Sequence, residues 1–365
     1  MNRRLISCIV LGLGLGLAGH AYGQSIPPAL KTSTTLSADN RATIAAFVKA
    51  QVAKLTGTDS AGQSAARELL CGEGSSPSAT TTYADAYAQA VAEALLPLAD
   101  DPSVRVRLSV GIISARVADR CNSSRFTAVA LKLIKDKAEP VELWGLKAAK
   151  ATLGAQMRQQ ALMNDPLLLA LVPAVQRNLT GPLTQEAYEA LRLNITNDRN
   201  GVTDAMIKAV VPEMQKLLQL RLAAYGQGVP SDPQTDTMAT SFLIDTKVWA
   251  AQSREQKTTT AQSLVDLLYA ASRRTADFEA KDKPEARPHK DELVQTLKLV
   301  GSGLRVVGDN ESSAVLSSAA VPLTKLDVSI DSGTISKFAD EAIAAVVAIP
   351  SLKGVKTPTT MPVAK

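Results

Sequence analysis

Histidine, cysteine and aromatic residues are scarce in this sequence of 365 residues. It contains two histidines, three cysteines and only 4% phenylalanine, tryptophan and tyrosine. His20 belongs to a segment that we expect to be removed, and His289 sits in the charged, proline-containing loop that begins at residue 281, where we interpret it as a solvated surface residue. A zinc site needs several ligands, and a Ser–His–Asp triad needs a positioned histidine. We therefore predict no catalytic residue, no cofactor and no metal site.

The first 23 residues have the three parts of a cleavable export signal. Two arginines near the start precede an uncharged apolar stretch, residues 5–18, and Ala21 and Gly23 supply the small residues before a cleavage site. The apolar stretch is too short to span roughly 30 Å of hydrocarbon as a permanent helix. We therefore predict cleavage after Gly23 and a periplasmic or secreted protein that begins at Gln24.

Two motifs inside this signal imitate functional sites. Gly14–Gly19 fits the spacing G-x-G-x-x-G, but a dinucleotide site needs that pattern between a strand and a helix. Residues 5–8 resemble the lipobox of bacterial lipoproteins, yet Cys8 precedes the apolar stretch, whereas the lipidated cysteine follows it. We therefore expect neither nucleotide binding nor lipidation.

Charge is nearly balanced once the signal is removed. Arg3 and Arg4 leave with it, so 38 of the 40 basic residues remain against 35 acidic ones, a formal charge of +3. Nucleic-acid binding relies on a clustered basic face, and no long basic run occurs here, so we predict no nucleic-acid partner. The apolar content of 45% supports a substantial core. No later stretch is long and uncharged enough to predict a transmembrane segment in the mature chain.

Cys71 and Cys121 are the two cysteines of the mature chain. In an oxidising compartment an isolated pair favours a disulfide, and closing a loop of this length would contribute roughly 4 kcal/mol in the chain-entropy model. Two buried free thiols, or a reactive pair, are the alternatives. We predict a Cys71–Cys121 disulfide.

Apolar residues recur at helical spacing from residue 37 onward. Residues 24–36, which contain two prolines and a threonine-rich run, predict an extended lead-in. Ser37 is a suitable N-cap for the first helix, a second spans 59–70 and stops at Cys71-Gly72, and a small-residue loop covers 72–82. The apolar faces of the first and third helices are formed by Ile44, Phe47, Val48, Val52 and Leu55, and by Tyr83, Tyr87, Val91 and Leu95.

The helix predicted after Asp101–Arg105 is apolar on two faces, which indicates a helix covered by neighbours on both sides. One face carries Val104, Leu108, Ile112 and Ala115, and the other carries Val106, Val110, Ile113 and Val117. An Asp-Pro turn followed by Val-Arg resembles the turn of a HEAT repeat. A second unit covers 131–153, and Asp165-Pro166 opens another helix.

A spacing near 40 residues supports the same resemblance. Leu171–Pro173 and Val210–Pro212 recur 39 residues apart, within the range of HEAT and armadillo repeats. The resemblance to this family spans roughly residues 83–222, and we assign the array to 37–222. It implies an all-α fold, an α-solenoid of stacked helical hairpins, with a closed α/α toroid as the alternative.

The C-terminal part keeps a helical pattern. We predict that residues 223–350 add further hairpins to the array, with helices over 240–251, 261–278, 291–307 and 335–349. Residues 323–330 alternate briefly, which indicates a short strand or a connector. Residues 351–365 are rich in proline, threonine and lysine and lack acids, so we predict a disordered tail.

Three features resemble binding sites, and we interpret each as structural. Residues 197–204 approximate a calcium loop, but Ile207 stands where the bidentate glutamate is needed, so a turn and a helix cap at Thr203 fit better. Trp144 and Trp249 lie in apolar helical patterns and are assigned to the core. A solvated helix edge with paired or exposed arginines is predicted for Arg105, Arg107, Arg116 and Arg120.

The repeat resemblance implies a binding module, because stacked repeats create extended surfaces suited to proteins or peptides. We therefore expect an exported, non-enzymatic scaffold that binds a protein or peptide in the bacterial cell envelope. One alternative is a polysaccharide hydrolase or lyase on an α/α toroid, since paired carboxylates need not be close in the sequence. The low aromatic content argues against it. Another alternative is a structural envelope component.

Overall fold

The computed structural model describes residues 25–74, 78–158, 165–192, 202–228, 230, 232–279, 286–308 and 312–362. Regular structure in these ranges is helical, apart from an isolated bridge between Lys353 and Val355. The α-helices are α1 (Pro28–Lys31), α2 (Ala38–Leu55), α3 (Ser60–Glu73), α4 (Thr81–Leu95), α5 (Val104–Arg120), α6 (Thr127–Leu133), α7 (Glu139–Arg158), α8 (Pro166–Val175), α9 (Gly181–Leu191), α10 (Asp204–Tyr225), α11 (Asp236–Leu243), α12 (Thr246–Ala251), α13 (Arg254–Arg274), α14 (Ala286–Val307), α15 (Ser313–Thr324) and α16 (Ser332–Val347).

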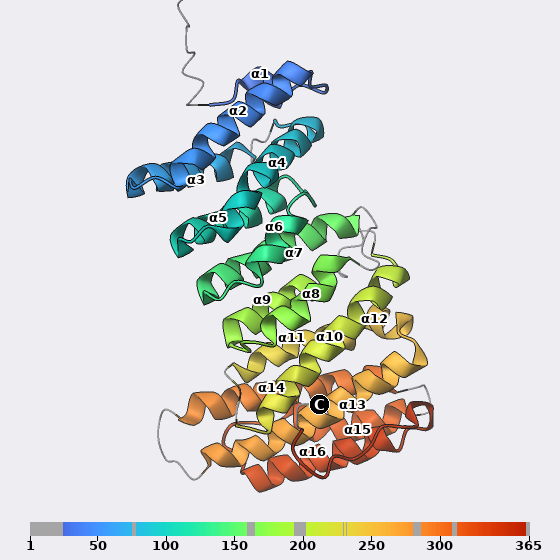
Figure 1. Cartoon of the computed structure of the whole chain (residues 1–365). Helices are drawn as coiled ribbons and strands as arrows, with labels where there is room; N and C mark the ends of the chain where they lie inside the picture. Colours follow the sequence, from blue (N-terminus) through green and yellow to red (C-terminus); the bar gives the residue numbers. More distant parts are fainter. Residues whose placement is uncertain are drawn as a thin grey trace, which may run out of the picture.

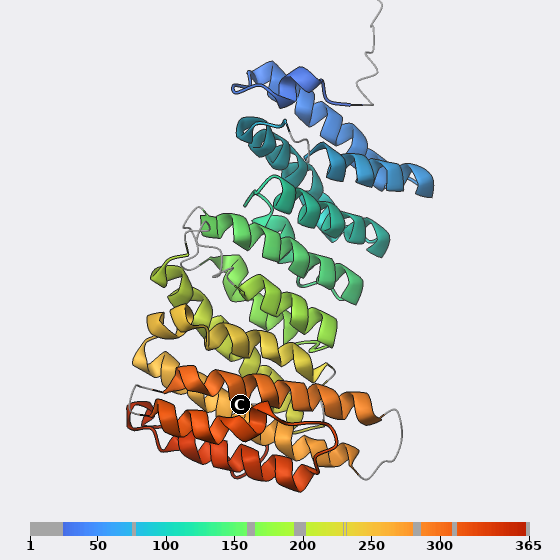
Figure 2. The same cartoon turned by 180° about the vertical axis from the view of Figure 1, so that it is seen from behind.

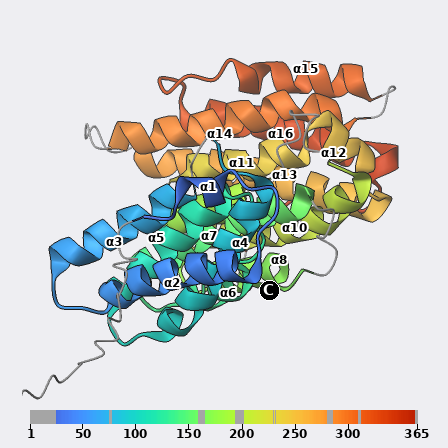
Figure 3. The same ribbon diagram turned by 90° about the horizontal axis from the view of Figure 1, so that it is seen from above.

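The helices stack in two layers along one axis (Figures 1 and 2). One layer runs α3, α5, α7, α9, α11 and α14, and each of these helices packs on the next. In the other layer α2 packs on α4, α8 on α10, α10 on α13, and α13 on α16. Seen from above, successive helices of the stack overlie one another (Figure 3). The chain is therefore all-α, an α-solenoid of stacked helical hairpins, as the repeat resemblance implied.

The two ends of the stack lie apart. Helices α1 to α3 form one end, and α15 and α16 form the other (Figure 1). The array is open, so the alternative of a closed toroid is wrong. In the part of the chain that the structure describes, no helix is both long and apolar enough to cross a membrane.

Two hydrophobic clusters form the core, and α5, α6 and α7 contribute to both. The predicted second face of α5, from Val106 to Val117, is fully buried. Its first face is only partly covered, because Val104 is the first residue of the helix and is 46% exposed. Gly145 lets α7 approach α6, since a Cβ at this position would lie 2.7 Å from the backbone of Leu133 and Ile134.

Several predicted boundaries need correction. The lead-in contains the short helix α1 and is docked, with Ile26 1% exposed and Thr80 N–H donating to the Lys31 carbonyl at 2.9 Å. Helix α3 continues through Cys71-Gly72 to Glu73. The predicted helix over 240–251 is two helices, α11 and α12, joined at the N-cap Asp245. Residues 323–330 are not a strand, because they hold the end of α15 and a turn.

Candidate peptide-binding groove

The C-terminal residues differ more from the sequence prediction than any other part of the chain that the structure describes. We predicted a disordered tail over 351–365, but residues 351–362 lie along α13 and α10, and 363–365 fall outside the described residues (Figure 1). A 3-10 turn over Pro350–Leu352 begins the segment. Leu352 and Val355 are buried, at 3% and 6% exposure, and they join the main hydrophobic cluster. Their burial orders a stretch whose composition is typical of disorder.

A side-chain amide of α13 holds the main chain of this segment. The Lys356 N–H donates to Gln262 Oε1 at 2.7 Å, and Gln262 Nε2 donates to the Lys356 carbonyl at 3.1 Å. The same Nε2 donates to Asp266 Oδ1 at 2.9 Å, one turn further along the helix. Asp266 therefore fixes the orientation of the amide, which leaves Oε1 free to accept. This contact uses only groups that every residue except proline has.

A cavity of about 620 Å³ lies between the segment and the helices. Lys216 lines it, with its Nζ 2.6 Å from Glu213 Oε1. The other lining residues are Val172 of α8 and its C-cap Gln176, Gln219, Leu220, Leu222 and Ala223 of α10, Gln262 and Asp266 of α13, and Thr357 to Pro362 of the segment itself. The groove therefore combines apolar, amide and charged groups, and the segment fills it only in part.

The far end of the groove is at the C-cap of α10. Met361 packs against the core there, and the Pro362 carbonyl passes so close to Gly226 that a Cβ at that position would overlap with it. Glycine at the end of a helix is common for conformational reasons. Here it also makes room for a second chain segment.

A second cavity, of about 570 Å³, lies at the start of the segment, where Ser351 and Leu352 line it. Trp249, Arg254 and Lys257 line it too, and Lys257 Nζ lies 5.6 Å from the Trp249 ring. We assigned Trp249 and Trp144 to the core, but both are only half-buried against it. Trp144 similarly lies under a lysine, Lys147, at 5.3 Å.

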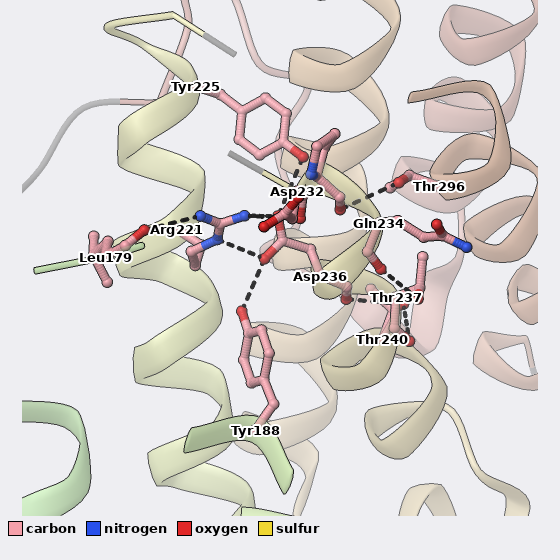
Figure 4. A network of polar contacts seen from close by, with 11 residues as sticks. Leu179, Tyr188, Arg221, Tyr225, Asp232, Gln234, Asp236, Thr237, Thr240 and Thr296 are labelled. Carbon is pink, nitrogen blue, oxygen red and sulfur yellow. Dashed lines mark hydrogen bonds and ion pairs between the residues drawn. The ribbon is translucent and has the colours of Figure 1, made fainter. Parts of the chain in front are cut away.

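The most deeply buried charges form a closed network rather than a binding site (Figure 4). Arg221 of α10 pairs with Asp236 of α11 at 3.0 Å, and both side chains are fully buried. The hydroxyls of Tyr188 and Tyr225 donate to the same carboxylate at 3.0 and 3.2 Å. Burial, together with the charge of Asp236, raises the pKa of both tyrosines well above the ordinary value, so they remain donors. The network ties α9, α10 and α11 together.

Cys71 and Cys121 are both free thiols in the structure. The ends of α3 and α5 lie together, because Arg120 donates to the Cys71 carbonyl and Cys121 Sγ lies 3.8 Å from the Gly74 carbonyl. Burial raises the pKa of Cys121 to about 12 and also raises that of Cys71, which makes both thiols unreactive. The disulfide between them stays a prediction for the exported protein.

The predicted arginine edge is partly paired and partly exposed: Arg105 is exposed, and the other three arginines have partners. Arg107 contacts Asp136, Arg116 contacts Glu68 at 3.3 Å, and Arg120 donates to a backbone carbonyl, so these side chains serve the packing of neighbouring helices.

The other predicted features fall partly outside the described ranges. His289 is exposed, as predicted, but it lies on α14 and not in a loop, with Nδ1 3.9 Å from Glu292 Oε2. The calcium-like loop lies largely in residues 193–201, outside the described part, whereas Thr203 caps α10 as predicted. The export signal also precedes the described residues. Among those residues no group of three histidine, cysteine or acidic side chains could hold a metal ion.

Comparison with known proteins finds similarity only among solved structures. No protein-family model and no curated protein matches the chain. A designed armadillo repeat protein is 15% identical, with a TM-score of 0.41 over 68% of this chain and 99% of that chain. An engineered protein is 18% identical, with a TM-score of 0.44 over 87% and 88% of the two chains. A designed armadillo repeat protein in complex with the peptide (KR)4 is 14% identical, with a TM-score of 0.41 over 68% and 98%. Since these scores are low, the fold assignment rests on the helix packing described above.

Proposed function

We propose that this chain is a non-enzymatic binding or scaffold protein of the cell envelope, which holds extended segments of partner proteins in the groove between α10 and α13. Export rests on the N-terminal signal and remains part of the proposal. The single observation that carries the binding role is the double hydrogen bond between the Gln262 amide and the main chain of Lys356. Like the main-chain bonds that add a peptide to a sheet edge, this contact holds the backbone of a segment and does not depend on its side chains.

No structural observation favours either of the two alternative functions. The hydrolase or lyase depended on a closed toroid, and the array is open. The sequence favoured a structural component only through its lysine-bearing C-terminal tail, which could touch anionic polymer or lipid, whereas residues 351–362 are engaged with α10 and α13.

The test uses a full chain in which Val355→Glu forces the C-terminal segment out of the groove, because a carboxylate is costly to bury at that position. This protein is presented to a phage-displayed library of random decapeptides. We expect enrichment of binding peptides, and we expect Gln262→Ala in the same background to abolish it.

The matched control is Gln295→Ala. Gln295 is also a half-buried helical glutamine that donates to an aspartate four residues away, at 3.5 Å on α14, but it lies outside the groove. Circular dichroism verifies that all three proteins are folded. Absence of enriched peptides on the folded Val355→Glu protein, or equal enrichment with and without Gln262, would disprove the proposed function.

A further inference from the structure

The groove already holds a peptide, and that peptide belongs to the chain itself. Resting on the proposed function, we infer that residues 353–362 are an intramolecular ligand that a partner must displace. The partner segment is extended, carries apolar side chains six positions apart, as Val355 and Met361 are, and has no acidic residue beside Asp266. The structure thus indicates both the kind of partner and a built-in competitor for it.

The two ends of the segment are anchored and the middle is not. Val355 is buried, and Met361 packs against the core cluster. Between them Lys356, Thr357, Thr359 and Thr360 are exposed. The chain bends at Thr359 and Thr360, so the two apolar contacts lie closer together than the roughly 20 Å that six fully extended residues would span. A foreign segment that meets this spacing fits with varied intervening side chains, provided that the residue at the position of Lys356 is not proline and that none beside Asp266 is acidic.

Few contacts hold the middle of the segment, residues 356–360, so another segment can replace it. The two Gln262 bonds reach Lys356, and no hydrogen bond to Thr357, Pro358, Thr359 or Thr360 joins them among the described residues. The cavity of about 620 Å³ lies directly beneath this stretch. A segment with larger side chains here would fill space that the threonines leave open.

Charge restricts the choice of partner further. Asp266 lies beside the clamp, bonded to Gln262, and a carboxylate placed against it would be repelled. The chain's own segment obeys this restriction, since residues 350–365 include three lysines and no acidic residue. Neutral or basic extended segments are therefore the class that fits.

Competition within one chain has a calculable effect. A tethered segment acts at an effective concentration on the order of 1 mM. If the segment itself binds the groove with a Kd of about 100 µM, it occupies the groove about ten to one, and a partner peptide binds the intact chain roughly tenfold more weakly than the empty groove.

The experiment measures binding of a fluorescein-labelled peptide with the sequence of residues 353–362 by fluorescence anisotropy. Four full-length proteins are compared: the unchanged chain, Val355→Glu, Val355→Glu with Gln262→Ala, and Val355→Glu with Gln295→Ala. We expect binding to Val355→Glu, binding at least tenfold weaker to the unchanged chain, a loss with Gln262→Ala, and no change with Gln295→Ala.

Two outcomes overturn the inference: no peptide binding to the folded Val355→Glu protein, or equal binding to that protein and to the unchanged chain. These outcomes are distinguishable from failure of the proposed function. Gln262-dependent library peptides that bind Val355→Glu, while the chain's own peptide does not, would leave the peptide-binding role standing and remove the intramolecular ligand.

Discussion

Replacement of Asp236 by asparagine should be among the most destabilising conservative changes in this protein. The substitution is nearly isosteric, so it removes the charge without opening a cavity. It leaves the guanidinium of Arg221 fully buried without its counter-charge, and breaking one partner of a buried pair typically costs about 3–5 kcal/mol. One of the two tyrosine hydroxyls that donate to the carboxylate also loses its acceptor, because asparagine places an NH2 group where one carboxylate oxygen stood.

Asp85→Asn is the matched control. Arg125 contacts Asp85 through Nε and Nη2 at 3.1 and 3.0 Å, and Arg221 contacts Asp236 through the same atoms at 3.0 and 3.4 Å. The two pairs differ in burial, because the Arg125 and Asp85 side chains are 48% and 52% exposed. An exposed pair contributes less than about 1 kcal/mol.

Urea unfolding at pH 7, followed by circular dichroism at 222 nm, measures both variants. With a slope on the order of 2–3 kcal/mol per molar urea, a loss of about 4 kcal/mol lowers the midpoint by roughly 1.5 M, whereas Asp85→Asn should lower it by under ~0.5 M. Equal shifts for the two variants would refute the reasoning, since burial would then not decide what the pair contributes.

Three further predictions concern packing, pH and thiol chemistry. Gly145→Ala should lower the free energy of unfolding in urea by about 1–3 kcal/mol, because the added Cβ would meet backbone atoms that cannot rotate away. Gly72→Ala is the matched control: Gly72 is also helical, but no atom lies within 4 Å of the added Cβ, so this change should be neutral or stabilising. Hydrogen bonds from Arg107 and from backbone N–H groups outweigh the effect of burial and lower the pKa of Asp136. Its contribution to the free energy of unfolding is therefore present above the ordinary pKa of 3.8 and is lost as the pH falls below that value. Asp136→Asn should reduce this change in stability with pH. Mass spectrometry of the denatured, non-reduced exported protein should find no alkylatable thiol at Cys121, and two alkylated thiols would remove the predicted disulfide. After reduction, alkylation of native Cys121 should stay slow up to about pH 10, because burial raises its pKa to about 12.

The architecture could be predicted because it depends on local signals. Ser37 and Asp165 cap their helices as their positions in the sequence predict, and the apolar spacing of α2 and α4 matches the buried residues. The Asp-Pro turn precedes α5, whose second apolar face is buried as predicted. Each of these signals lies within a few residues of the structure that it specifies.

The groove could not be predicted because it depends on contacts between distant residues. Gln262 and Lys356 are separated by 94 residues, and composition alone makes the tail look disordered. Arg221 and Asp236 gave no signal either, since charged residues are almost never fully buried unless paired, and the pairing is visible only in three dimensions. The division of 240–251 into α11 and α12 likewise follows from packing against α10 and α14.

Main-chain capture by Gln262 is tested most directly by methylating one peptide nitrogen. The peptide of residues 353–362 is prepared with an N-methyl group at Lys356, which removes the N–H that donates to Gln262 Oε1, and in a control form with the methyl group at Thr359, whose N–H has no hydrogen-bond partner among the described residues. Loss of one hydrogen bond of about 0.5–1.5 kcal/mol weakens binding roughly two- to tenfold. Titration into the Val355→Glu protein should show this loss for the Lys356 peptide and little change for the Thr359 peptide. Equal affinity of the Lys356-methylated and unmodified peptides would contradict recognition through the main chain.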